Sequence, residues 1–395
     1  MLRRSESPKK FDVIVVGGGP AGSATALSLS RRGYSVAMIE RSGYADTRVG
    51  ETLPPSIRKL LVDLRVWDEF VAGNHSPSFG IHSAWGQAEL YANDFIFNPY
   101  GTGWHVDRAR FDAMLARNVE RAGTKLYRRA QLISSAEDGT GGWDIEFACE
   151  GGRKGLRAKL VVDATGRKSL LACRQGAKRI TCDRLVGVVC FFSSGSPQFR
   201  SDNDTLVEAG EDGWWYSAAL PDSRIIVAYM TDADLFGKAS KRTPNYWQPQ
   251  RRNAPHTHAR IRSRALQSGP FIFAANSSRL DDVAGKNWLA VGDAAMAFDP
   301  LSSQGVYNAL MSGVLAAQAI ECSLAGDQRE LHSYAVVIEN NFAKYLVTRE
   351  KYYRRETRWP NSLFWKRRRV TERQFYNASR LRRAEDSALS NIGMT

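Results

Sequence analysis

A glycine-rich turn near the start of the chain has the residue types and spacing needed to bind phosphates. The motif G-x-G-x-x-G consists of Gly17, Gly19 and Gly22 and directly follows the apolar run 11–16. Gly17 permits a tight turn, Gly19 lets a pyrophosphate approach the backbone, and Gly22 lets the next helix pack on the strand. The N-terminus of that helix would hold the phosphates. Glu40 ends the second strand, where its carboxylate can accept hydrogen bonds from both ribose hydroxyls, so the ordered features predict a dinucleotide site.

The elements that must position this motif form an α/β domain. Short β-branched apolar runs at 11–16, 34–40 and 159–166 are typical of buried parallel strands. The helical pattern after the glycines ends at Gly33, which completes one βαβ unit within the first forty residues. The run 287–295 returns to the buried-strand pattern much later in the chain. We therefore expect a Rossmann-like sheet whose strands are interrupted by a second domain.

The sequence between about 181 and 273 has a different residue pattern from the rest, because short apolar runs alternate there with turn residues. That alternation is typical of an antiparallel sheet. We predict an α/β fold with an inserted antiparallel-sheet domain and a helical C-terminal extension. The predicted limits are 1–78, 106–180 and 271–325 for the dinucleotide-binding domain, 79–105 and 181–270 for the substrate domain, and 326–395 for the extension.

Four segments, in order along the chain, resemble the FAD-dependent monooxygenases and halogenases of the para-hydroxybenzoate-hydroxylase type. They are GGGPAG with Glu40, Arg108-x-x-Phe111-Asp112-x-x-Leu115, VVDATGRKS at 161–169, and VGDAAMAFDPLSSQG at 291–305. The resemblance implies that the dinucleotide is FAD.

The same resemblance implies roles for individual residues. Asp293 would bind the ribityl chain, Gly292 would lie near the pyrophosphate, and Pro300 would border the isoalloxazine ring. The helix that starts at 303–305 would direct its amides to the flavin N1/O2 edge, where reduced flavin carries negative charge. The implied cofactor-binding set is Gly17, Gly19, Pro20, Ala21, Gly22, Glu40, Arg41, Arg48, Arg108, Gly292, Asp293, Pro300, Ser303, Gln304, Gly305 and Val306.

Within this group the chain is most similar to the halogenase branch, with two departures. The similarity lies in VGETLPP at 49–55, GWWYSAALP at 213–221 and RWPNSLFW at 358–365. Tryptophan halogenases carry a lysine in the strand after the first of these segments, and the matching position here is Gly80. Halogenases also share a W-x-W-x-I-P motif, and the matching segment of this chain lacks the second tryptophan of that motif. Halogenation is therefore disfavoured.

A halogenase-like chain without that lysine resembles flavoproteins that hydroxylate tryptophan residues of partner proteins during the biogenesis of tryptophylquinone cofactors. The resemblance implies a monooxygenase that uses a flavin hydroperoxide, formed from molecular oxygen, to hydroxylate an indole ring. Electrons would come from NAD(P)H directly or through a separate flavin reductase. The alternatives are a hydroxylase or halogenase of a free small aromatic such as tryptophan, a flavin reductase of the prenyl-reductase kind, and a flavin-bound assembly factor without turnover.

Several residues near the expected flavin are candidates for catalysis or substrate binding, and each also has a purely structural interpretation. Glu51 is a proton carrier or a carboxylate that fixes its loop, while His82 and Trp85 line the substrate pocket or pack between domains. On the strand 213–219, alternation puts Trp214 and Tyr216 on one face and Trp215 on the other. The candidate catalytic residues are Glu51, His82, Pro300 and Gln304, and the candidate pocket residues are Trp85, Trp214, Trp215 and Tyr216.

The chain carries a net charge of +14, which favours an anionic partner. Residues 349–383 hold 13 Lys or Arg against three acids, with interleaved aromatics. We interpret this region as a docking face for an acidic protein substrate, against the alternatives of a solvated helix, nucleic acid or a membrane surface. Five cysteines without C-x-x-C spacing indicate a reducing compartment and no metal site. No apolar run is long enough to span a bilayer, so we expect a cytoplasmic protein without nucleic acid as a partner.

Overall fold

The glycine motif follows the first strand of an eight-stranded sheet. We describe the protein from a computed structural model, in which residues 8–193, 203–240 and 253–369 are described. The strand order is β19-β20-β11-β1-β2-β8, and an antiparallel hairpin of β9 and β10 extends β11. The strands are β1 (Lys9–Val16), β2 (Val36–Ile39), β8 (Lys125–Tyr127), β9 (Gln131–Glu137), β10 (Trp143–Cys149), β11 (Gly152–Asp163), β19 (Ala284–Gly285) and β20 (Trp288–Ala290).

The parallel centre of this sheet is buried, as its β-branched residues require. Residues Val13–Val16 of β1 are at most 4% exposed and pair with both β2 and β11. Helices α1 (Pro20–Ser30), α4 (Arg108–Arg121) and α9 (Gly305–Leu324) pack together beside it. A Cβ at Gly313 of α9 would lie 2.4 Å from the carbonyl oxygen of Ala21, so only glycine allows α9 this close to α1. The smaller helices here are α2 (Ile57–Asp63), α3 (Trp67–Ala72) and α5 (Leu170–Arg174).

A seven-stranded, mostly antiparallel sheet forms the second layer. Its order is β17-β13-β16-β15-β14-β5-β6, and β5 joins β14 in parallel. The strands are β5 (Gly80–Ala84), β6 (Tyr91–Asp94), β13 (Leu185–Phe192), β14 (Thr205–Gly210), β15 (Gly213–Ala219), β16 (Ile225–Asp232) and β17 (Leu266–Ala274), and the helices beside it are α6 (Ala233–Ser240) and α8 (Pro255–Ile261). There are also two three-stranded sheets among the described residues: β3 (Thr52–Leu53), β7 (Gly103–His105) and β4 (Ser76–Ser78), and β12 (Arg179–Thr181), β18 (Ser278–Leu280) and β21 (Met296–Ala297).

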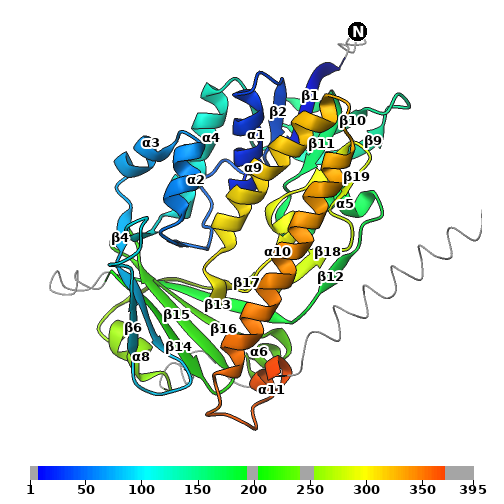
Figure 1. The fold of residues 1–395 in the computed structure, drawn as a ribbon. Helices are drawn as coiled ribbons and strands as arrows, with labels where there is room; N and C mark the ends of the chain where they lie inside the picture. The colour runs from blue at the N-terminus through cyan, green and yellow to red at the C-terminus, as the bar shows by residue number, and fades with distance from the viewer. Residues whose placement is uncertain (1–7, 194–202, 241–252, 370–395) are drawn as a thin grey trace, which may run out of the picture.

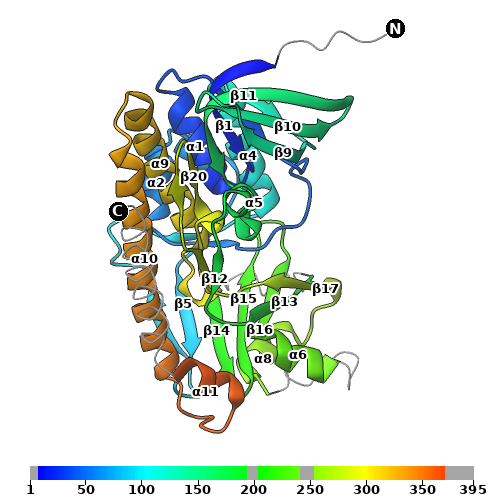
Figure 2. The ribbon, with the colours of Figure 1, turned by 90° about the vertical axis from the view of Figure 1, so that its right-hand side faces the viewer.

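Two C-terminal helices join the layers. The long helix α10 (Arg329–Arg354) runs along one side of the molecule from the eight-stranded sheet to the seven-stranded sheet, and α11 (Leu363–Arg369) packs beside the latter (Figures 1 and 2). Residues 370–395 of the predicted extension lie outside the described residues.

The predicted fold class is confirmed, because a Rossmann-like sheet, an antiparallel sheet and C-terminal helices are all present. The predicted domain limits stay a prediction. The strands of the seven-stranded sheet fall within 80–94 and 185–274.

Candidate active site

The glycine loop opens onto a cavity. Gly17 has φ +108°, and a Cβ there would lie 2.0 Å from the carbonyl oxygen of Ala164, so only glycine fits this turn. A Cβ at Gly22 would lie 2.0 Å from the Gly17 carbonyl oxygen, whereas one at Gly19 would meet no heavy atom within 4 Å. The N-terminus of α1 has no side-chain cap. Its unpaired N–H groups therefore suit a pyrophosphate in the open space at Gly19.

Residues from distant parts of the chain, between Gly19 and Ala309, line this cavity, whose volume is about 350 Å³. The predicted cofactor residues that line it are Gly19, Pro20, Ala21, Gly22, Arg48, Arg108, Asp293, Pro300, Ser303, Gly305 and Val306. The first turns of α1 and α9 both contribute, so two helix N-termini face one space. Their dipoles favour negative charge there, as carried by a pyrophosphate and by reduced flavin.

The remaining predicted cofactor residues lie outside the lining of the cavity. Glu40 is buried, and its Oε2 accepts the Gly18 N–H at 2.6 Å while Oε1 accepts the Ser42 hydroxyl at 2.5 Å. A Cβ at Gly292 would lie 2.7 Å from the Ala21 Cβ, so Gly292 gives close packing on α1. Residues outside the lining are Gly17, Glu40, Arg41, Gly292 and Gln304, the last of which is the N-cap of α9.

Two arginines of the cavity share one buried carboxylate. Asp112 is fully buried on α4, and its Oδ2 accepts Arg48 Nη1 at 2.5 Å while its Oδ1 accepts Arg108 Nε at 3.3 Å. Arg108 also donates to the Val49 carbonyl. Asp112 therefore holds both cations at the wall of the cavity. Sequence reasoning quoted Asp112 within a motif but missed this role, although its spacing of four from Arg108 on a helix was a signal.

Arg167 is a second residue that the sequence interpretation missed. It lines the cavity, and its Nε lies 3.4 Å from the Asp293 Oδ2. The same guanidinium donates to the carbonyl oxygens of Asn276 at 2.5 Å and Phe298 at 3.3 Å. It therefore orients Asp293, whose side chain is 42% exposed. Its place in the VVDATGRKS motif was the available signal.

The far end of the cavity is apolar and belongs to the seven-stranded sheet. Its lining there includes Val189, Ile226, Ala228, Met230 and Phe273. A surface of this kind suits an aromatic ring and excludes water.

Tyr216 brings a hydroxyl to the same region. Its OH lies 2.6 Å from the Thr52 hydroxyl, and both residues line the cavity. Burial raises the pKa of Tyr216 well above its ordinary value, so the phenol stays protonated.

Glu51 is the one candidate catalytic carboxyl in the cavity lining. It is 3% exposed, and its Oε2 accepts the Gly50 N–H at 2.9 Å, while Oε1 has no hydrogen-bond partner. Burial raises the pKa of Glu51 to about 7, although backbone N–H groups and Arg108 act to lower it. A buried carboxyl that titrates near neutrality can give or take a proton under working conditions.

The predicted tryptophans lie outside this cavity. Trp214 points to the same face of β15 as Tyr216, as alternation predicted, but packs with Trp85 at a centroid distance of 6.3 Å. Trp215 lies on the opposite face against Tyr229, with ring centroids 4.6 Å apart. Among the predicted pocket residues, only Tyr216 lines the cavity.

The other three candidate catalytic residues differ in placement. Gln304 lies outside the lining, at the N-cap of α9. His82 lies on β5 outside the lining, with its Nε2 3.5 Å from Asp204 Oδ2. Pro300 lines the cavity at the turn before α9.

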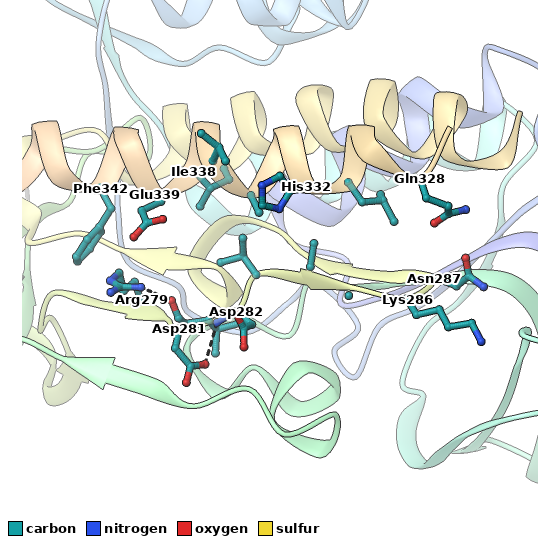
Figure 3. Close-up of a pocket in the computed structure, with 17 residues that line it drawn as sticks. Arg279, Asp281, Asp282, Lys286, Asn287, Gln328, His332, Ile338, Glu339 and Phe342 are labelled. Carbon is teal, nitrogen blue, oxygen red and sulfur yellow. Dashed lines mark hydrogen bonds between the residues drawn. The ribbon is translucent and has the colours of Figure 1, made fainter. Parts of the chain in front are cut away.

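A second cavity, of about 610 Å³, lies between α10 and the β18–β20 segment (Figure 3). It shares no residue with the first cavity. Side chains of both signs line it, among them Asp282, Lys286, His332 and Glu339. No unpartnered buried polar side-chain atom from the described residues belongs to its lining.

The site and fold together define a flavin-dependent enzyme. Residues 10–348 match the family model described as FAD binding domain, and the chain belongs to that family. The cavity fits FAD, because its open glycine loop, two helix N-termini and arginine wall suit a flavin dinucleotide. The chain is 32% identical over 367 residues to the putative FAD-dependent oxidoreductase LodB of Marinomonas mediterranea, covering 91% of this chain and 97% of that protein.

Halogenases and a hydroxylase are also similar. The chain is 25% identical to a tryptophan 2-halogenase of Chondromyces crocatus, covering 81% of this chain and 63% of that protein. The structure of the myxobacterial chondrochloren halogenase CndH superposes with a TM-score of 0.84 at 26% identity, covering 95% of this chain and 90% of that one. The peptidyl tryptophan dihydroxylase QhpG gives a TM-score of 0.75 at 25% identity, covering 91% and 78%. The resemblance to FAD-dependent, halogenase-like proteins is therefore confirmed.

Within the described ranges, no helix combines the length and apolar character needed to cross a membrane.

Proposed function

We propose that this protein is an FAD-dependent monooxygenase that hydroxylates the indole ring of a tryptophan residue in a partner protein or peptide. The observation that carries the proposal is the composition of the cavity. Among the described residues its lining includes Arg48, Arg108 and Arg167 but no lysine, and Gly80 lies buried on β5 away from it. Among the described residues the lining therefore offers no lysine amine of the kind that tryptophan halogenases carry, whereas it does offer the apolar wall that an indole needs.

Bound FAD, once reduced, would activate molecular oxygen for insertion into the ring, with electrons from NAD(P)H directly or through a reductase. The chain's own residues would bind and orient the reactants. The N-terminus of α9 would stabilise negative charge on the flavin, and Asp112 would keep Arg48 and Arg108 in place. Glu51 would hold a proton at Oε1 near neutral pH and give it up within the cavity. An indole needs no prior deprotonation, so no strong base has to face the substrate.

Similarity supports a protein substrate. QhpG acts on a peptidyl tryptophan in tryptophylquinone cofactor biogenesis, and LodB is similar along almost the whole chain. In the described part of the predicted docking face at 349–383, several arginines already form ion pairs within the protein. Arg358 pairs with Glu356 at 2.6 Å, and Arg349, Arg367 and Arg368 pair with aspartates. Residues 370–383 of that face lie outside the described residues. Lys351 and Lys366 remain exposed without an ion pair among the described residues, and could contact an acidic partner.

A halogenase is the second candidate, because CndH superposes over 95% of the chain. Mass spectrometry separates the two. Reduced FAD, oxygen and bromide are incubated with the protein and either free tryptophan or a partner protein encoded nearby. A gain of one or two oxygen atoms on a partner tryptophan, with free tryptophan unchanged, supports the proposal. A brominated product, or oxygen inserted only into free tryptophan, refutes it.

A further inference from the structure

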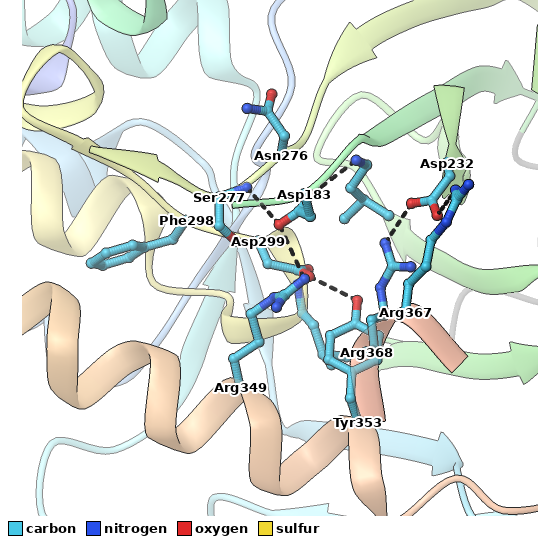
Figure 4. Close-up of polar contacts among 12 residues, drawn as sticks. Asp183, Asp232, Asn276, Ser277, Phe298, Asp299, Arg349, Tyr353, Arg367 and Arg368 are labelled. Carbon is cyan, nitrogen blue, oxygen red and sulfur yellow. Dashed lines mark hydrogen bonds and ion pairs between the residues drawn. The ribbon is translucent and has the colours of Figure 1, made fainter. Parts of the chain in front are cut away.

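Three arginines near the C-terminal end of the described chain, Arg349, Arg367 and Arg368, are bound by carboxylates from distant elements. Arg349 of α10 is 5% exposed and contacts Asp299 at 3.2 Å and Asp183 at 3.0 Å (Figure 4). Arg367 and Arg368 of α11 contact Asp232 of β16, both at 2.8 Å (Figure 4). Buried ion pairs of this kind need good geometry, because each ion has left water. These arginines therefore connect the C-terminal helices to other elements of the fold.

Asp299 is the member of this network that lines the cavity, and it is 1% exposed. Its Oδ1 accepts the Leu301 N–H at 2.9 Å and so caps the turn that contains Pro300. Its Oδ2 accepts Arg349 Nε at 3.2 Å and the Tyr353 hydroxyl at 2.7 Å. Its backbone N–H donates to the Tyr345 hydroxyl at 2.8 Å. Three side chains of α10 thus hold the residue that starts the turn.

Tyr353 extends the contact to the seven-stranded sheet. Its ring is fully buried, and its hydroxyl accepts the indole N–H of Trp214 on β15 at 3.0 Å. Trp85 packs against the same tyrosine with ring centroids 5.7 Å apart. The chain of hydrogen bonds runs from Trp214 through Tyr353 to Asp299. It therefore ties the sheet that ends the cavity to the turn that precedes α9.

We propose that Arg349 and Tyr353 are positioning residues that fix the turn at 299–303, so that Pro300 and the first amides of α9 face the flavin. The proposal concerns FAD binding and goes beyond the proposed hydroxylation. Loss of Arg349 would leave the buried Asp299 and the partly buried Asp183 without their shared cation. Loss of the Tyr353 hydroxyl would leave both Asp299 and the Trp214 indole N–H with one partner fewer.

Two variants and one matched control test the proposal. The variants are Arg349→Gln and Tyr353→Phe, and the control is Arg367→Gln. Arg367 bridges Asp232 and Asp234 in the same C-terminal region but does not contact the turn. For each protein the Kd for FAD is measured by titrating the FAD-free protein, together with the visible absorption spectrum of the bound flavin and the melting temperature.

We expect both variants to raise the Kd for FAD about tenfold, the equivalent of one charge-assisted hydrogen bond, and to shift the flavin spectrum. The control should lower the melting temperature while Kd and spectrum stay unchanged. If the control changes Kd and spectrum as much as Arg349→Gln does, or if Tyr353→Phe changes neither, the proposal is refuted. Should Arg349→Gln not fold, the near-isosteric Tyr353→Phe decides alone. These measurements use no substrate, so they do not depend on the proposed hydroxylation.

Discussion

Replacing Glu51 by glutamine tests whether this carboxyl is neutral inside the folded protein. Glu51 is 3% exposed, and its Oε1 has no hydrogen-bond partner. Glutamine has nearly the same shape as a protonated glutamic acid, and its carbonyl oxygen can still accept the Gly50 N–H. The substitution therefore removes the ability to ionise while leaving most of the packing in place.

The sign and size of the effect follow from the pKa. The folded-state pKa of Glu51 is raised from 4.5 to about 7 by burial. Below pH 4.5 the carboxyl is protonated in both states, so ionisation contributes nothing. As pH rises from 4.5 to about 7, the unfolded chain releases its proton and the folded protein does not, so folding loses free energy. Above pH 7 the full loss of folding free energy persists. It amounts to about 3 kcal/mol, at about 1.36 kcal/mol for each unit by which the folded and unfolded pKa values differ.

The assay is urea unfolding of FAD-free wild type and Glu51→Gln at about pH 5 and about pH 8.5, the two sides of the titration. The variant should match wild type within about 1 kcal/mol at the lower pH and exceed it by about 3 kcal/mol at the higher one. Glu208→Gln is the control. Glu208 is equally buried, and its two oxygens accept the N–H groups of His256 and Thr257. An amide cannot accept both, so this control loses stability. If the gain from Glu51→Gln is the same at both pH values, Glu51 is not a buried acid that titrates near neutrality.

Three further predictions concern the flavin site. A Cβ at Gly22 would lie 2.0 Å from the Gly17 carbonyl oxygen, so Gly22→Ala should lower the melting temperature of the FAD-free protein. Gly19 has free space, so Gly19→Ala should keep that melting temperature and weaken FAD binding about tenfold in a fluorescence titration; the same defect from both variants contradicts this. Asp293→Asn should also raise the Kd for FAD about tenfold, through one lost charge-assisted contact in the cavity. Turnover should fall as pH rises through about 7, because Glu51 loses its proton there, and this fall should be absent from the pH profile of Glu51→Gln. If the fall persists in the variant, another group causes it.

The aromatic residues of β15 show which contacts the sequence could predict and which it could not. Alternation along β15 correctly separated Trp215 from Trp214 and Tyr216, because side chains on a strand point to opposite faces. It could not tell that Trp214 turns to Tyr353 of α10, which lies 139 positions later in the chain. The interpretation of the C-terminal arginines had the same limit. Their charge was visible in the sequence, but their partners Asp183, Asp232 and Asp299 were not.

The sequence by itself determined the class of cofactor and the architecture that holds it. Gly17, Gly19 and Gly22 act through their own backbone geometry, and the strand and helix that flank them are encoded by local apolar patterns. Apart from the close approach of Gly17 to Ala164, these features depend on neighbours a few residues away, so their spacing is enough to predict them. Only the tertiary structure decided that Glu51 is buried away from solvent, that Asp112 pairs with two arginines, and that α10 contacts the turn before α9. Burial and ion pairing depend on contacts between distant segments, and the folded packing alone brings those segments together.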